Sequence, residues 1–180
     1  MGKYTNELTR AMERLGEHPK VRIIGQSTLW DGHALFRTWK NVPVEKRWEL
    51  PVFEDFQMGM TIGLAMQDWI PLSIYPRMDF IILAANQLTN HLANIRLVSN
   101  GKWKRHIIIR VTVGATEPLY SGLQHSQDHT ETLRTLSRGE VDVVELHSWE
   151  DVFPAYEYAL LRTDKKPTIL VEYSNLYNGE

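Results

Sequence analysis

Glu54 carries the carboxyl group in this sequence that is best placed for proton chemistry. An extended run, residues 51–53, leads into it, and a helix-like stretch that contains Gly59 and Ala65 follows. A carboxyl group at such a junction, among apolar neighbours, is held partly out of water, where burial disfavours its charged form. It could therefore exchange a proton with a buried nitrogen heterocycle. The alternative is that Glu54 and Asp55 simply stabilise the positive end of a helix.

A second polar cluster is Gln124-His125-Ser126-Gln127, with His129 close behind. If both histidines lie on one helix, they are one turn apart and could share a metal ion. No third ligand is indicated, however, and the zinc-protease pattern lacks its glutamate, so we expect no metal site on this chain. Ser126 lacks the glycines of a nucleophile elbow. His125 remains either a hydrogen-bond donor to a substrate or an ordinary histidine of a surface loop.

Phosphate-binding motifs are missing from the sequence. There is no dinucleotide fingerprint and no Gly-Lys-Ser/Thr phosphate loop. Asp31-Gly32 is not preceded by glycine, so nothing resembles a metal-diphosphate site. If the chain binds a phosphorylated cofactor, something other than these motifs must hold the phosphates.

Alternating strand and helix patterns predict how these residues are positioned. We expect helices at residues 4–15, after Glu54, at 81–95, in part of 127–137 and at 151–162, and strands at 21–24, 71–75, 106–111, 141–146 and 168–171. This alternation favours an α/β fold, with a mainly parallel sheet flanked by helices. Ligands of such sheets bind at the carboxyl ends of strands. Glu54 and the segments after Tyr75 and Val111 fall at such ends.

Composition narrows the function further. The 180 residues fit one domain, and a net charge of -2 gives no reason to expect nucleic acid or an anionic membrane as a partner. The basic cluster at residues 102–105 follows the turn signal Asn100-Gly101, so we expect a solvated loop there. There is no cysteine for a disulfide or a thiolate. Without a signal peptide or a membrane-spanning stretch, we expect a soluble cytoplasmic protein.

Taken in order, these segments resemble the beta subunits of the thiamine-dependent 2-oxo acid dehydrogenases, of the pyruvate and branched-chain type, over nearly the whole chain. The spacing between Glu54 and the Gln124–Gln127 cluster is the most specific feature. The matching residues are Val21-Arg22-Ile23-Ile24-Gly25, Trp30-Asp31-Gly32-His33-Ala34, Pro51-Val52-Phe53-Glu54, Gly59, Ile62-Gly63, Ala65-Met66, Pro71, Phe80, Asn86-Gln87, Asn90, Ala93, Ser99-Asn100-Gly101-Lys102, Arg110, Gly114, Gln124-His125-Ser126-Gln127, Val171-Glu172-Tyr173 and Leu176-Tyr177-Asn178-Gly179.

The resemblance implies the pyrimidine-binding domain of the transketolase-like thiamine diphosphate enzymes, with their three-layer α/β fold. In that family, the glutamate that matches Glu54 hydrogen-bonds the aminopyrimidine ring and so activates the cofactor. Phe80 matches the aromatic residue that packs on this ring, and His125 matches a histidine near the substrate. Phe53 and Pro76 match positions beside the cofactor but differ in type from the usual residues. Together with Asp55 and a less glycine-rich loop at residues 114–120, they suggest a divergent member with a different donor or acceptor.

The resemblance also implies partners. Family beta subunits continue past Gly179 into another domain, so we expect residues 1–180 to be a single pyrimidine-binding domain without that C-terminal domain. Thiamine diphosphate would be shared with a separately encoded alpha-like subunit that carries Mg²⁺, in a dimer of heterodimers. Gly59 and Gly63 could admit a helix of a second copy, or they could serve packing within the chain.

Several functions fit this pattern. The first is decarboxylation of a 2-oxo acid, and a second is the carbon–carbon bond transfer of transketolases and carboligases on a ketose. Another is a non-catalytic binding module on the same fold, and the last is an unrelated α/β domain with coincidental motifs. Retention of Glu54, Phe80 and His125 argues for an enzyme.

Overall fold

The centre of the molecule is a six-stranded parallel sheet with the strand order β2-β1-β3-β4-β6-β5. The computed structural model describes residues 2–32, 35–116 and 120–178, so His33, Ala34, part of the 114–120 loop and Gly179 lie outside the described residues. The strands are β1 (Val21–Gly25), β2 (Arg47–Glu49), β3 (Ile70–Tyr75), β4 (Ile108–Val113), β5 (Asp142–Leu146) and β6 (Thr168–Tyr173).

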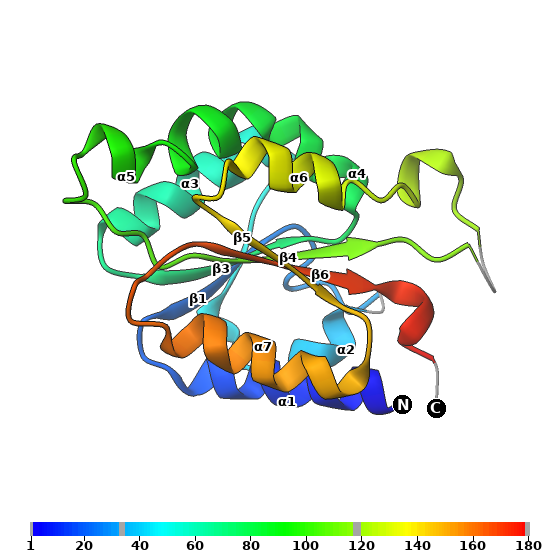
Figure 1. The fold of residues 1–180 in the computed structure, drawn as a ribbon. Coiled ribbons are helices and arrows are strands. Elements are labelled where there is room, and N and C mark those ends of the chain that lie inside the picture. The colour runs from blue at the N-terminus through cyan, green and yellow to red at the C-terminus, as the bar shows by residue number, and fades with distance from the viewer. Residues whose placement is uncertain (1, 33–34, 117–119, 179–180) are drawn as a thin grey trace.

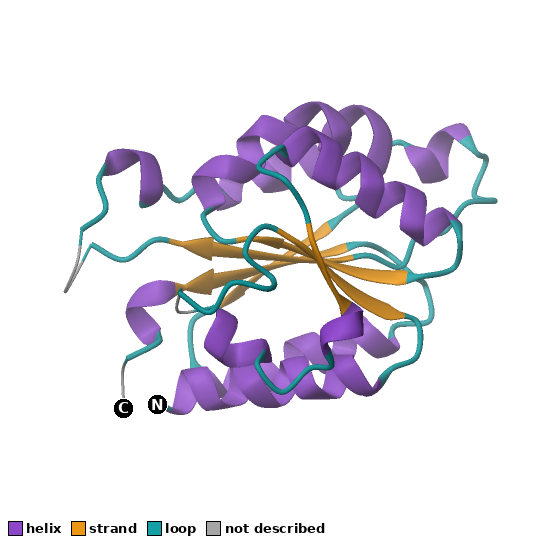
Figure 2. Cartoon of the chain, turned by 180° about the vertical axis from the view of Figure 1, so that it is seen from behind, coloured by secondary structure: helices purple, strands orange, loops and turns teal. Residues whose placement is uncertain are grey.

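Helices cover both faces of the sheet, which confirms the predicted α/β fold (Figures 1 and 2). One layer, uppermost in Figure 1, contains α3 (Glu54–Met66), α4 (Met78–Ile81), α5 (Ile95–Val98) and α6 (Thr130–Ser137). The other contains α1 (Lys3–Glu17), α2 (Phe36–Trp39) and α7 (Trp149–Leu161). Short 3-10 turns are η1 (Val44–Lys46), η2 (Ile82–Ala84), η4 (Leu123–His125) and η5 (Ser174–Leu176). Among the described residues, no helix is long and apolar enough to cross a membrane.

Strand β4 shows why its sequence is a continuous apolar run. Ile108 packs with the α1 and α7 layer, whereas Ile109 and Val111 pack with the α3 and α6 layer. Successive side chains of a strand point to opposite faces, and here both faces are covered. Polar residues on β4 are therefore buried, and they need partners inside the protein.

Arg110 and Glu172 meet this need in a fully buried network between β4 and β6. Arg110 Nε lies 2.8 Å from Glu172 Oε1, and Arg110 also donates to Thr38 Oγ1 at 2.8 Å. The hydroxyl groups of Tyr156 and Tyr177 donate to the same carboxylate. Burial lowers the pKa of Arg110, but the adjacent Glu172 carboxylate outweighs this and raises it. The charge of each partner is thus stabilised by the other.

Two predicted elements differ from the structure. Residues 51–53 do not form a strand; the strand that precedes Glu54 is β2, which pairs only with β1 at the edge of the sheet. Of its three residues, Arg47 and Trp48 are partly buried and Glu49 is exposed, and there is no apolar alternation. The sequence therefore carries no strand signal there.

The long helix predicted at residues 81–95 is irregular. After α4 and η2, residues Gln87–Leu92 form a π-helix, η3, in which the Ala93 amide bonds the Leu88 carbonyl at 2.9 Å, before α5 begins. The wider turn keeps Leu88 and Leu92 buried, while Gln87 donates to Asp55 at the start of α3.

The two glycines of α3 do not both serve packing within the chain. The nearest atom to a Cβ on Gly59 would be in the Gln87 side chain, at 3.7 Å. Gly63 is exposed, and a Cβ there would meet no atom within 4 Å. The alternative of close intrachain packing is therefore wrong for Gly63.

Candidate functional site

Glu54 is the first residue of α3 and is only 5% exposed, although its side chain is a carboxyl group. Gln26, directly after the last residue of β1, donates from Nε2 to Glu54 Oε1 at 2.8 Å. No described residue donates to Oε2. The carboxyl group is thus fixed through one oxygen, while the other is available to a ligand.

Gly25 allows the chain to bring Gln26 to this position. Its φ is +149°, and a Cβ there would lie 2.6 Å from the Ile74 carbonyl oxygen. It would also lie 3.2 Å from the amide nitrogen of Gln57, which donates to Ser73 and Ile74 of β3. Only glycine permits β1 to end this close to β3 and α3.

Phe80 and His125 lie against each other, although they are far apart in the sequence. Their ring centroids are 5.5 Å apart with an interplanar angle of 89°, an edge-to-face arrangement. Both are partly buried. His125 Nδ1 is buried and has no hydrogen-bond partner among the described residues, so this nitrogen could bond a ligand.

The turn that carries His125 is anchored from two sides. A Cβ on Gly114, just after β4, would lie 1.8 Å from the His125 carbonyl oxygen, so only glycine fits there. Gln127 donates to Asp79 from its backbone nitrogen at 3.3 Å and from its side chain at 3.0 Å. Asp79 adjoins Phe80 in α4, so these contacts hold the turn against that helix.

Phe53 and Pro76, the other two candidate cofactor-binding residues, lie at the same edge of the sheet. Pro76 is partly buried and follows β3, whose last residue, Tyr75, donates to the Glu54 carbonyl oxygen at 3.5 Å. Phe53 is 58% exposed and stacks on Phe56 at a centroid distance of 6.2 Å. The structure therefore brings Phe80 and His125 together, whereas Phe53 belongs to an exposed aromatic surface beside Glu54.

The two histidines that could have shared a metal ion are not on one helix. His125 ends η4, the next three residues are not helical, and His129 precedes α6. In the described part of the chain, no three His, Asp or Glu residues are grouped as a metal site.

Gln26 and Asp79 belong to this edge, but no motif marks them in the sequence. Gln26 had one signal, because it directly follows a strand that ends in glycine at the predicted ligand-binding edge. For Asp79, the only signal in the sequence was its position directly before Phe80.

No family model matches the chain, but individual proteins of known sequence and structure do. The chain is 25% identical over 174 residues to the pyruvate dehydrogenase E1 component subunit beta of Cyanidium caldarium, covering 92% of this chain and 50% of that protein. It is 28% identical over 128 residues to the 2-oxoisovalerate dehydrogenase subunit beta of Bacillus subtilis, covering 69% and 38%. The chain therefore spans half or less of the length of these relatives.

A solved structure described as a split gene transketolase, inactive beta4 tetramer, superimposes with a TM-score of 0.68. The two sequences are 16% identical, and the match covers 94% of this chain and 51% of that one. The chain therefore has the pyrimidine-domain, transketolase-like fold, and its sequence is related to the beta subunits of the pyruvate and 2-oxoisovalerate dehydrogenases.

Proposed function

We propose that this chain is the pyrimidine-domain subunit of a two-chain thiamine diphosphate-dependent enzyme that acts on a 2-oxo acid or a ketose. The observation that carries the proposal is the buried carboxyl group of Glu54, with one oxygen held by Gln26 and the other free of described partners. The relationship to the 2-oxo acid dehydrogenase beta subunits supports the substrate class.

The residues of this edge fit the pyrimidine end of the cofactor. Glu54 Oε2 would share a proton with a nitrogen of the pyrimidine ring, and Gln26 would keep the carboxyl group oriented. Phe80 would pack on the ring and Pro76 would border it, whereas exposed Phe53 would contact the cofactor only within the assembled complex. When bound, thiamine diphosphate supplies the carbon nucleophile that attacks the substrate carbonyl.

His125 would act on the substrate. Its unpartnered Nδ1 and its contact with Phe80 place a polar group beside the aromatic residue proposed for the cofactor. A histidine nitrogen in this position can donate a hydrogen bond to negative charge that develops on the substrate oxygen.

Replacing His125 with Ala should lower kcat/KM by about 10²-fold and leave the affinity for thiamine diphosphate nearly unchanged. Steady-state kinetics and calorimetric titration of the cofactor measure the two effects separately. If cofactor affinity falls and turnover of the saturated enzyme does not, His125 belongs to the cofactor site instead.

The surface beside Glu54 supports a partner subunit. Large apolar side chains are exposed around this edge, and such patches mark interaction sites; they are Leu29, Phe53, Phe56, Tyr120 and Leu123. A separately encoded alpha-like subunit would cover them and supply the diphosphate and Mg²⁺ sites, for which the sequence carries no motif. The structural neighbour, described as the product of a split gene and as inactive in its beta4 form, is consistent with this division.

The outward face of α3 supports self-association in a dimer of heterodimers. Exposed Gly63 leaves room for the backbone of a second helix. Next to it, a groove of about 300 Å³ is lined partly by Ile62, Met66 and Val98, and Met66 and Val98 are exposed. A second copy would bury these apolar groups.

Replacing Gly63 with Arg should shift the chain toward a smaller species in sedimentation velocity, because the new side chain fills the space that a second helix would occupy. Loss of a helix-interior glycine favours folding of α3 by roughly 1 kcal/mol, so unfolding would not explain the change. Thr132→Arg, at an exposed position of α6, is the matched control and should leave the distribution as it is. An unchanged distribution for both variants would contradict the proposed interface.

The test of the function itself requires the companion chain. A neighbouring gene should encode Gly-Asp-Gly followed by an asparagine about thirty residues later. The two purified chains, with thiamine diphosphate and Mg²⁺, should bind the cofactor and turn over 2-oxo acids, while neither chain alone does so. Product analysis with an added aldehyde identifies transketolase- or carboligase-type transfer. Binding without turnover of any donor would favour the non-catalytic module, and absence of binding would refute the proposal.

A further inference from the structure

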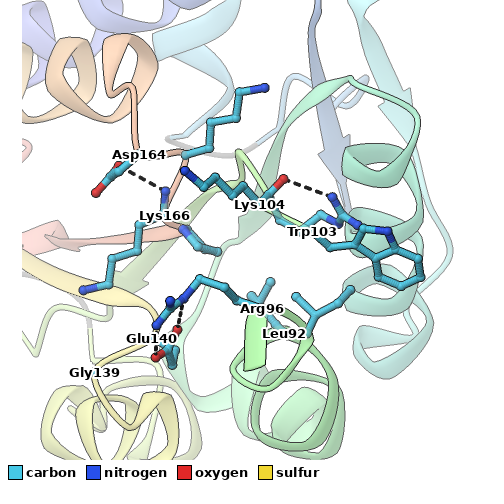
Figure 3. Close-up of a pocket in the computed structure, with 12 residues that line it drawn as sticks. Leu92, Arg96, Trp103, Lys104, Gly139, Glu140, Asp164 and Lys166 are labelled. Atoms are coloured by element: carbon cyan, nitrogen blue, oxygen red, sulfur yellow. Dashed lines mark hydrogen bonds and ion pairs between the residues drawn. The ribbon is translucent and has the colours of Figure 1, made fainter. Parts of the chain in front are cut away.

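A cavity lies at the amino-terminal ends of β4, β5 and β6, opposite to the strand ends near Glu54. It has a volume of about 310 Å³ and is bordered by the segments that lead into β4, β5 and β6 and by η3 and α5 (Figure 3). Since β4 is six residues long, roughly 20 Å of strand separates these ends from the carboxyl ends. The cavity is therefore distinct from the proposed cofactor site.

Both acidic side chains that line the cavity are already paired. Arg96 holds Glu140 through two contacts of 2.6 and 2.7 Å. Asp164 is held by Arg162, which lies outside the cavity, at 2.6 Å, and this contact lowers the pKa of Asp164 to about 2. Of the lining cations, Lys166 pairs with Asp142. The remaining positively charged side chains that line the cavity therefore form no ion pair with these acids.

Arg105 is the most buried of these positively charged side chains. Only 9% exposed, it lies 4.9 Å from the Trp103 ring centroid, and it donates to the Lys104 carbonyl oxygen at 3.0 Å. Its Nε is buried and has no partner. In the part of the chain that the structure describes, no carboxylate forms an ion pair with it. The expectation of a solvated loop at residues 102–105 is therefore wrong for this residue.

A buried guanidinium without a counterion is unfavourable. Burial lowers the pKa of Arg105, and the charge of Asp68, which forms no ion pair with it, offsets only part of this effect. Removing a charge from water costs free energy that a bound anion would offset. Lys104 and Lys165 also line the cavity, and no described carboxylate pairs with either of them. The three side chains together bring three positive charges to one cavity, which favours a multiply charged anion.

We propose that this cavity binds a small organic phosphate. Arg105, Lys104 and Lys165 would hold the phosphate group, for which a planar guanidinium is well suited. Trp103, Leu92 and Ile95, which also line the cavity, would contact an apolar or aromatic part of the molecule. The volume is at the lower end of the range for small-molecule sites, so the ligand is a metabolite-sized compound rather than a nucleic acid.

Calorimetry and thermal unfolding of the full chain with phenyl phosphate test this proposal. Phenyl phosphate should bind and raise Tm, and benzyl alcohol, of similar shape but uncharged, should do neither. Arg105→Met should weaken phenyl phosphate binding about tenfold or more. Without the anion, the same variant should unfold at an equal or higher temperature than the native chain, because it removes an unpaired buried charge.

Lys102→Met is the matched control, since it removes one positive charge from the same loop at an exposed residue that does not line the cavity. Its binding of phenyl phosphate should match that of the native chain. If Arg105→Met does not fold, Lys165→Met, at an exposed position, replaces it with the same expectation. Equal binding by the native chain and the cavity variant, or equal weakening by Lys102→Met, would overturn the proposal.

Discussion

Replacing Glu54 with Gln in the assembled two-chain complex should lower kcat/KM by about 10²- to 10⁴-fold, the range that a positioned proton-transferring group contributes. Gln has the same shape and can still accept the Gln26 hydrogen bond seen at Oε1, but it cannot take up and return a proton. Cofactor affinity should also fall, because the amide group cannot form the proton-sharing hydrogen bond that is proposed for Oε2. Steady-state kinetics and cofactor titration measure both effects.

Asp55→Asn is the matched control for this experiment. It removes one negative charge from the same first turn of α3, where an acidic residue contributes about 0.3–1 kcal/mol, so both variants lose a similar interaction with the helix. The Asp55 carboxylate accepts from Gln87, at the start of η3, and an amide oxygen can replace it. Turnover should therefore stay close to the native value. Equal activity of the two variants would remove the proposed role of Glu54.

The strands could be predicted where burial alone decides the pattern. In β3, β4 and β6, side chains on both faces enter the core, so apolar and β-branched runs were sufficient evidence. Strand β2 could not be predicted, because none of its three residues is fully buried and they are held at the edge of the sheet by pairing with β1. The π-helix η3 could not be predicted either, because the spacing of its apolar residues also fits an α-helix.

The candidate site was predictable in part. Glu54 could be singled out because it lies between an extended run and a helix, and His125 because it lies in a polar cluster. Both residues also match family positions. Gln26 and Asp79 could not, since their roles depend on contacts between segments distant in sequence. Arg105 was mistaken for a solvated residue because its basic neighbours are indeed exposed, and only the fold reveals which side chain of the loop turns inward.

The buried network around Glu172 links the core to the proposed site. Glu172 is near the carboxyl end of β6, beside Thr112 of β4 in the register. Gly114, against which the His125 turn packs, directly follows the last residue of β4. The network joins this part of the sheet to α7 through Tyr156. Loss of this network should therefore mainly lower the stability of the fold, and to a smaller extent shift the turn that carries His125.

Replacing Glu172 with Gln should lower the free energy of unfolding by about 3–5 kcal/mol, because it leaves the Arg110 guanidinium buried without its charge partner. The new amide group would also place N–H donors where the Tyr156 and Tyr177 hydroxyl groups donate. Urea unfolding followed by circular dichroism measures the change. A matched control is Glu140→Gln, which breaks a pair whose Arg96 side chain is 54% exposed and should cost no more than about 1 kcal/mol.

The double variant Arg110→Met/Glu172→Gln separates the cost of an unpaired charge from the cost of lost hydrogen bonds. Removing both charges eliminates the uncompensated guanidinium, so the double variant should be more stable than Glu172→Gln alone. If the two substitutions are simply additive, the ion pair contributes little, and the stability of this region comes from the tyrosine hydrogen bonds and from packing. The coupling energy from this cycle therefore shows whether the ion pair is needed to stabilise the carboxyl ends of β4 and β6, near which the His125 turn packs.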